Sequence, residues 1–267
     1  MPRMLVGAVE LYCERSGTGP RVLLISGTGG DLRQRPSITD GPLSAHFEVL
    51  AYDQRGVGQS SIPEGPYSMA DYADDAAHLL SAVGWDEALV LGISFGGMVA
   101  QELALRHRKR VRKLALACTS SGGEGGASYP LHELADLEGE DSVVRHLELA
   151  DTRFDKAWRE ENPDDCEGLV KLLASRAEVG KGEPRRVEGH ALQLDARRRH
   201  NTWGRLDQIT CPTLVTAGRY DGIAPPDNSE RMASAIPNAQ LRVFDGGHLF
   251  LLQDPAAFAA IIEFLAA

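Results

Sequence analysis

Short apolar runs alternate along this chain with stretches whose apolar residues recur at helical spacing, and this alternation constrains the fold most. Residues 22–25 form a continuous apolar run of the kind that is buried on both faces of a sheet. Since right-handed crossovers place helices on both faces of a parallel sheet, the alternation predicts an α/β fold with a mostly parallel central sheet. Further strand-like runs cover residues 47–52, 88–93, 113–118, 213–217 and 241–244.

Helices are predicted between these runs. Between Ser68 and Gly84 the apolar side chains recur at helical spacing, with Ser68 available as the N-cap and Gly84 as the terminator. The remaining predicted core elements are a helix at residues 98–105, a closing helix at residues 255–265 and an initial antiparallel hairpin at residues 4–8 and 10–15.

The composition changes after the strand-like run at residues 113–118. Residues 119–126 are rich in serine and glycine and predict a flexible connector, and a charged, helix-favouring region without strand-like runs follows to about residue 199. We therefore expect one α/β core built from residues 1–121 and 206–267, with residues 122–205 inserted between its two parts as a helical lid.

Charge and composition exclude several classes of partner. The formal net charge of −10 argues against nucleic acid and against an anionic membrane, because both are bound through clustered Lys and Arg. The amino terminus lacks the apolar segment of a secretory signal, and no apolar run is long enough to span a bilayer. We expect a soluble, cytoplasmic protein whose oligomeric state stays open. The scattered cysteines, which form no CxxC pair, are expected to be buried reduced thiols: Cys13, Cys118, Cys166 and Cys211.

The strongest local motif is Gly92-Ile93-Ser94-Phe95-Gly96, which lies where a predicted strand meets a predicted helix. A sharp turn at such a junction exposes the serine hydroxyl, and glycines relieve close backbone contacts around it. The alternative is an ordinary strand-to-helix turn with a helix-capping serine, since a GxSxG pattern also arises by chance. The position of the motif favours Ser94 as a nucleophile.

Two residues near the end of the chain fit the roles that a serine nucleophile requires. His248 follows the last strand-like run through two glycines and is predicted to be the base that takes the serine proton. Asp221 follows the preceding run and is predicted to orient the imidazole. The alternatives are a capping or surface histidine and an Asp-Gly turn, and Asp245 is a competitor for the acid role.

The order Ser94, Asp221, His248 is the order of the α/β-hydrolase superfamily, which this chain resembles over nearly its whole length except the variable lid. Residues 52–61 look like the loop that follows the second central strand in that family. Residues 65–68 and the elbow at residues 94–98 resemble enol-lactone hydrolases and related small esterases.

Within the loop at residues 52–61, a structural role is predicted for Asp53 and Arg55, which would pair with each other or bind backbone groups near the elbow.

An oxyanion hole is expected because the attacked carbonyl oxygen becomes negatively charged, so backbone donors must already point at its position. The Phe95 N–H is expected to provide one donor, and the resemblance implies the Thr28 N–H as the other. Many relatives have His-Gly where this chain has Ser26-Gly27.

Neither a cofactor nor a metal is expected. The glycines at residues 27–30 match neither GxGxxG nor a P-loop. His190 and His200 lie in an Arg-rich stretch without acidic or cysteine ligand spacing, so solvated surface histidines are predicted.

Several side chains of the predicted lid, or of the segment that returns from it to the core, have two possible roles. Trp158 and Trp203 could form apolar walls of a substrate site or serve packing alone. The run at residues 197–199 could attract a carboxylate-bearing substrate, although three consecutive arginines on a helix are usually a solvated face.

The sequence thus predicts a serine hydrolase that cleaves a small carboxylic ester or lactone through an acyl-enzyme on Ser94. Two other reactions use the same groups: carbon–carbon bond hydrolysis of a diketone, and cofactor-free perhydrolase chemistry. A further alternative is a small-molecule receptor with slow hydrolytic turnover. Dehalogenases and epoxide hydrolases are disfavoured, because those relatives have aspartate where this chain has Ser94.

Overall fold

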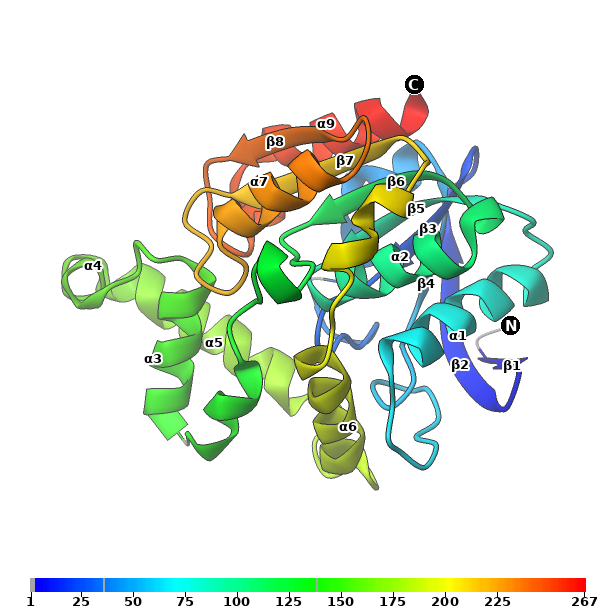
Figure 1. Ribbon diagram of the computed structural model, residues 1–267. Helices are drawn as coiled ribbons and strands as arrows, with labels where there is room; N and C mark the ends of the chain where they lie inside the picture. Colours follow the sequence, from blue (N-terminus) through cyan, green and yellow to red (C-terminus); the bar gives the residue numbers. More distant parts are fainter. Residues whose placement is uncertain (1–2, 36, 138) are drawn as a thin grey trace.

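The computed structural model describes residues 3–35, 37–137 and 139–267, which form one eight-stranded sheet with helices on both faces (Figure 1). The strand order is β1-β2-β4-β3-β5-β6-β7-β8, with β1–β2 and β2–β4 antiparallel and all other pairs parallel. The predicted mostly parallel sheet and the initial hairpin are confirmed. The strands are β1 (Arg3–Val6), β2 (Val9–Ser16), β3 (Arg21–Ile25), β4 (Glu48–Tyr52), β5 (Ala88–Ile93), β6 (Val111–Ala117), β7 (Thr213–Gly218) and β8 (Gln240–Phe244).

The central strand β3 shows why a continuous apolar run was required. Val22 and Leu24 pack into the core on one face of the sheet, while Leu23 and Ile25 pack into the core on the other face. The core that contains Leu23 and Ile25 also contains residues of α1 (Met69–Ala82), α2 (Phe95–Arg106) and α7 (Pro226–Ala235). The core that contains Val22 and Leu24 also contains residues of α8 (Phe250–Gln253) and α9 (Pro255–Ala266). Each face of the sheet is therefore sealed by helices.

Helix α1 begins as predicted. Ser68 is its N-cap, with its side chain accepting a hydrogen bond from Asp71 N while the Asp71 carboxylate accepts from Ser68 N. This reciprocal pair satisfies two backbone donors that the first turn leaves without partners.

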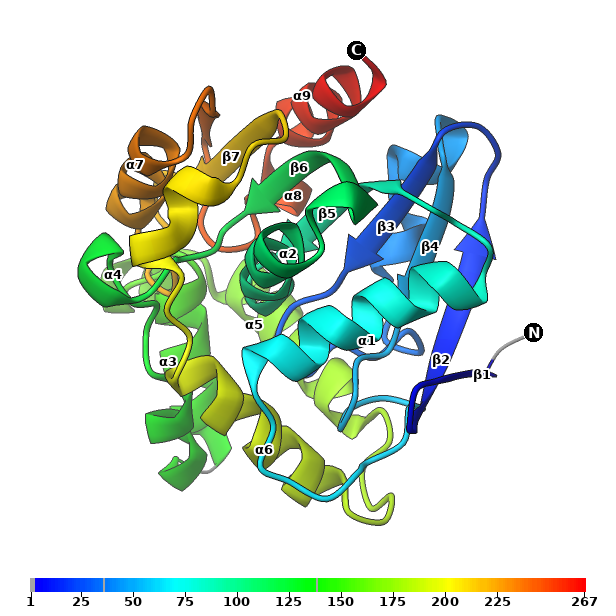
Figure 2. The ribbon, with the colours of Figure 1, turned by 45° about the vertical axis from the view of Figure 1, so that its right-hand side comes forward.

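The chain between β6 and β7 is a helical insertion, because these two strands are parallel neighbours in the sheet. Four α-helices lie in it: α3 (Gly139–Ala150), α4 (Lys156–Glu161), α5 (Pro163–Glu178) and α6 (Arg186–Arg198). Figures 1 and 2 show them gathered on one side of the sheet. The boundaries at residues 121 and 205 stay a prediction.

The predicted flexible connector at residues 119–126 is instead largely buried, with only Gly123 and Glu124 exposed, so it is not the solvated linker that was predicted. Ser120 and Ser121 are fully buried, and Asn228 Nδ2 of α7 donates to Ser120 Oγ at 2.9 Å. Two further bonds hold the serines inside: Gln101 Nε2 of α2 donates to Ser120 O at 3.1 Å, and Thr202 N donates to Ser121 O at 2.8 Å.

The cysteines follow the expectation in part. All four are free, but only Cys13 and Cys118 are buried, while Cys166 and Cys211 are partly exposed. Within the described part of the chain, no helix has the length and apolar character needed to cross a membrane.

Candidate active site

Ser94 lies at the junction between β5 and α2 in a conformation that few non-glycine residues adopt. Its φ is 54° and its ψ is −116°, and its side chain makes no capping hydrogen bond to the helix that it precedes. The alternative of a helix-capping serine is therefore wrong. Thr119 Oγ1 donates to Ser94 O at 2.7 Å, which supports this turn from the neighbouring strand end.

Three side chains that are distant in sequence meet at this turn. His248 Nε2 lies 3.0 Å from Ser94 Oγ, and His248 Nδ1 lies 2.8 Å from Asp221 Oδ2. An ionised carboxylate can only accept hydrogen bonds, so Nδ1 donates its proton to Asp221 and Nε2 is left to accept from the serine hydroxyl. The arrangement can move a proton from Ser94 to His248.

The loop after β7 fixes Asp221. The side chain is fully buried, and its Oδ1 accepts from Ile223 N and Ala224 N, each at 2.8 Å. These bonds leave Oδ2 directed at the imidazole. Asp245 is not in this position: its side chain is 71 % exposed and pairs with Arg153, so the competing assignment of the acid role is wrong.

The end of α3 supports the loop that carries His248, and this support was not predicted from the sequence. His248 N donates to Ala150 O at 2.5 Å. Gln253 bridges the two segments, since its Oε1 accepts from Gly247 N at 2.8 Å and its Nε2 donates to Asp151 Oδ2 at 2.9 Å. The sequence gives no signal of this support, because an aspartate two residues before an arginine, as in Asp151 and Arg153, is a common pattern.

The loop after β3 lies against the nucleophile. A Cβ placed on Gly27 would be 3.4 Å from the Ser94 Cβ. Gly29 N donates to Gln193 Oε1 of α6 at 2.7 Å. The Thr28 and Phe95 amides, by contrast, donate to no protein acceptor among the described residues. Within the described residues these two donors are therefore free of intramolecular partners; Phe95 follows Ser94 directly, and Thr28 follows Gly27, which lies against Ser94.

The loop after β4 is structural, as predicted. Asp53 accepts from Leu32 N at 2.7 Å and from Gln59 N at 2.8 Å, and burial raises the pKa of Asp53 to about 6. Arg55 does not pair with Asp53 but forms a two-point contact with Asp75, at 2.6 and 2.7 Å.

The arginine and histidine stretch of α6 departs from the prediction of a solvated face. His190 is exposed as expected, whereas His200 is buried, and that burial lowers its pKa to about 3. Arg197 is only 5 % exposed, while Arg198 and Arg199 are exposed and pair with Asp195. Helical geometry turns one of three consecutive side chains inward, so the run could not be solvated as a whole.

Both tryptophans pack against other side chains, and a role for either in a substrate site stays a prediction. The rings of Trp158 and Phe154 are in tilted contact, with centroids 4.4 Å apart. Trp203 packs against the core and closes over Gly125, where an added Cβ would lie 2.3 Å from its ring.

Among the described residues, Cys118, Asp221 and His248 are the group of metal-ligand side chains whose donor atoms come within 4.8 Å of one another. Asp221 and His248 are already bonded to each other, and burial raises the pKa of the Cys118 thiol well above its usual value. Because a thiol binds metal as thiolate, this group is better suited to hydrogen bonding than to holding an ion.

Comparison with known proteins gives consistent matches. A family model described as alpha/beta hydrolase fold matches residues 20–255. A poly(3-hydroxyalkanoate) depolymerase of Ectopseudomonas oleovorans is 32 % identical over 243 residues, covering 90 % of this chain and 82 % of the relative. A 2-hydroxymuconate semialdehyde hydrolase of Pseudomonas putida is 31 % identical over 273 residues, covering 92 % and 87 %. The crystal structure of an enol-lactonase from Burkholderia xenovorans LB400 superposes with a TM-score of 0.80 at 26 % identity, over the full length of both chains.

Proposed function

Because this chain belongs to the α/β-hydrolase fold family, we propose that it is a serine hydrolase that cleaves a small carboxylic ester or lactone through an acyl-enzyme on Ser94. The observation that carries the proposal is the chain of hydrogen bonds from Ser94 Oγ through the His248 imidazole to Asp221, at 3.0 and 2.8 Å. The names of the relatives, which include a depolymerase and an enol-lactonase, agree with acyl chemistry.

The reaction proceeds in two halves. His248 Nε2 takes the Ser94 proton as Oγ attacks the carbonyl carbon, and the Thr28 and Phe95 amides donate to the resulting oxyanion. His248 then gives the proton to the leaving alkoxide, which leaves an ester on Ser94. In the second half His248 activates a water that attacks this ester, and the acid departs with Ser94 restored. Asp221 holds the imidazole tautomer and stabilises its positive charge throughout.

The test is a turnover panel of short-chain esters, lactones and diketones, measured for the wild type and for Ser94→Ala. We expect turnover of esters or lactones and a loss of roughly 10⁴-fold or more in kcat for Ser94→Ala. Ser234→Ala, an exposed serine of α7, is the matched control and should leave kcat unchanged. Normal ester turnover by Ser94→Ala would rule out the mechanism.

The same panel separates the other reactions that these groups can perform. Cleavage of diketones in preference to esters would assign carbon–carbon bond hydrolysis, which the likeness to a 2-hydroxymuconate semialdehyde hydrolase keeps open as a second candidate. Peracid formation from hydrogen peroxide would indicate a perhydrolase. A single slow turnover accompanied by ligand-dependent capture of a partner would indicate a receptor.

A further inference from the structure

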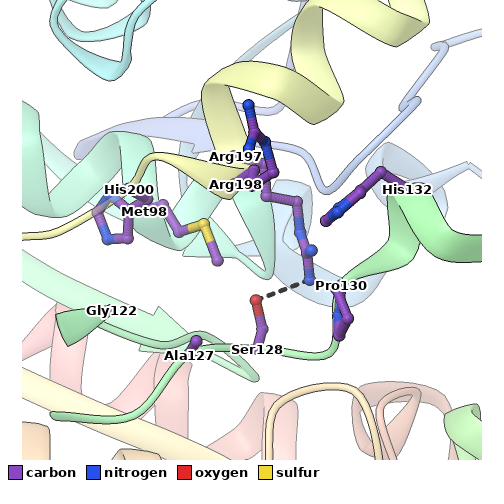
Figure 3. Close-up of a pocket in the computed structure, with 9 residues that line it drawn as sticks. All are labelled: Met98, Gly122, Ala127, Ser128, Pro130, His132, Arg197, Arg198 and His200. Carbon is purple, nitrogen blue, oxygen red and sulfur yellow. Dashed lines mark hydrogen bonds between the residues drawn. The ribbon is translucent and has the colours of Figure 1, made fainter. Parts of the chain in front are cut away.

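A cavity of about 270 Å³ lies between α6, the segment around residues 122–130 and α2 (Figure 3). Met98 of α2 forms part of its wall, and Met98 N donates to Ser94 O at 3.3 Å. Residues four apart on a helix are about 6 Å apart along its axis, so this wall lies one turn from the nucleophile. A substrate group that enters this cavity would therefore have to extend along one turn of α2 from a carbonyl held at Ser94.

Arg197 lines the cavity with a positive charge that the described residues leave uncompensated. Its Nη2 donates to Ser128 Oγ at 2.7 Å (Figure 3), and its Nη1 donates to Tyr129 O at 2.7 Å. Its Nε has no hydrogen-bond partner among the described residues. No carboxylate of the described residues lies within ion-pair distance of it, unlike Arg55, which faces Asp75. Burial lowers the pKa of Arg197 to about 10, so the guanidinium still carries its charge at neutral pH.

None of the described residues that line this cavity carries a negative charge to balance Arg197. The nine lining residues include Arg198 and His132 but neither aspartate nor glutamate. Arg198 is exposed and paired with Asp195, so its charge is balanced by that ion pair. A buried cation without a counter-ion is unfavourable unless an anion arrives to share the site.

We propose that Arg197 binds a carboxylate of the substrate, so that the preferred substrate is an ester or lactone that also carries a free carboxylate. This inference rests on the proposed function. A single guanidinium fits one carboxylate, whose two oxygens match its planar donors, and one unbalanced positive charge calls for a monoanion.

The alternative is that Arg197 is a structural support (a strut) that holds the Asp221 carboxylate in place. Tyr129, whose carbonyl accepts from Arg197, donates its own N–H to Ile223 O at 2.7 Å, and Ile223 N donates to Asp221 Oδ1. A strut would affect all substrates alike, whereas a carboxylate-binding residue would affect only those that carry the charge. The experiment is built on this difference.

The test compares kcat/KM for the monomethyl esters of succinate, glutarate and adipate with kcat/KM for the matching methyl esters whose free carboxylate is replaced by a carboxamide. We expect the wild type to prefer at least one carboxylate over its carboxamide by about 10-fold or more. Arg197→Met should abolish this preference, mainly through KM, and Arg197→Lys should retain part of it. Arg199→Met removes the same charge from an exposed position at the end of the same helix and should keep the preference.

A direct binding measurement accompanies the kinetics. Glutarate should raise the Tm of Ser94→Ala, should fail to do so for Ser94→Ala combined with Arg197→Met, and should act more strongly than inorganic phosphate.

Three results would overturn the assignment: equal wild-type kcat/KM for ester pairs, an equal loss for both members of each pair in Arg197→Met, or no thermal shift with glutarate. If the wild type hydrolyses neither these esters nor the esters and lactones of the turnover panel, the proposed function fails, and the thermal shift still decides whether Arg197 binds a carboxylate.

Discussion

Ser94 holds its strained backbone because glycines stand two positions before and after it. A Cβ on Gly96 would lie 2.1 Å from Ile25 O, which is backbone and cannot move aside. We expect Gly96→Ala to lower the free energy of unfolding by about 1–3 kcal/mol and to reduce kcat, because the turn must open.

Gly168→Ala is the matched control for this substitution. Gly168 also lies within a helix, α5, but an added Cβ there meets nothing within 4 Å. Gly168→Ala should raise stability by up to about 1 kcal/mol, as measured by urea unfolding. Equal effects of the two substitutions would show that the elbow is not under steric constraint.

Asp221 is expected to act on catalysis more than on stability. In Asp221→Asn the side-chain oxygen still accepts from Ile223 N and Ala224 N, but an amide facing His248 Nδ1 favours the wrong imidazole tautomer. We expect kcat to fall by about 10³- to 10⁴-fold with little change in KM, and Asp227→Asn, an exposed position, to leave kcat unaltered. A loss in Asp221→Asn below tenfold would contradict the role assigned to this residue.

These catalytic candidates could be predicted from sequence because each follows a strand end, and the carboxyl ends of parallel strands meet at one edge of the sheet. The orientations of Arg197 and His200 could not be predicted. Whether a side chain at the end of α6 faces water or the interior depends on which segment packs beneath it. Ser128 and Tyr129 contact Arg197, and the backbone of His200 lies against Gly122, but no pattern in the sequence pairs these residues.

At the scale of elements, the end of α3 ties together the loops that carry the acid and the base. Thr152 N donates to Tyr220 O at 2.9 Å and Gly222 N donates to Leu149 O at 3.0 Å, beside the bond from His248 N to Ala150 O. The strands and core helices were predictable from periodicity. These contacts were not, because they join segments some 70 to 100 residues apart and need no particular side chain.

Asp151 adds a side-chain contact to these backbone bonds. It is 1 % exposed and accepts from both Arg153 and Gln253. Burial alone would raise the pKa of Asp151, but the hydrogen bonds and charge of Arg153 outweigh burial and hold the pKa below its ordinary value. Its stabilisation is therefore complete above the unfolded-state pKa of about 3.9 and is lost as the pH falls through the lower folded-state value.

We expect Asp151→Asn to cost about 1–3 kcal/mol in the free energy of unfolding at pH 7, and to lower kcat because the His248 loop loses support. The cost should be constant down to about pH 5 and shrink below about pH 4. Urea unfolding across this range measures it, with the exposed Asp164→Asn as control. A cost that grows in acid would contradict the assigned direction of the pKa shift.

At the scale of the whole molecule, helices α4 and α5 of the insertion are buried much less than the core helices. Helix α2 has ten buried residues, whereas α4 and α5 have none among their described side chains. We expect the amides of α4 and α5 to exchange with solvent at least about 10-fold faster than those of α2 in hydrogen-exchange mass spectrometry. Equal protection of all three helices would show that the insertion unfolds only with the core.

The central claim is that Ser94 is the nucleophile that forms the acyl-enzyme, and labelling with a fluorophosphonate tests it most directly. Intact mass and peptide mapping should find one adduct, on the peptide that contains Ser94, with turnover lost in proportion to the labelled fraction and no adduct on Ser94→Ala. An adduct on another residue, or full ester turnover by protein whose Ser94 is completely labelled, would contradict the account.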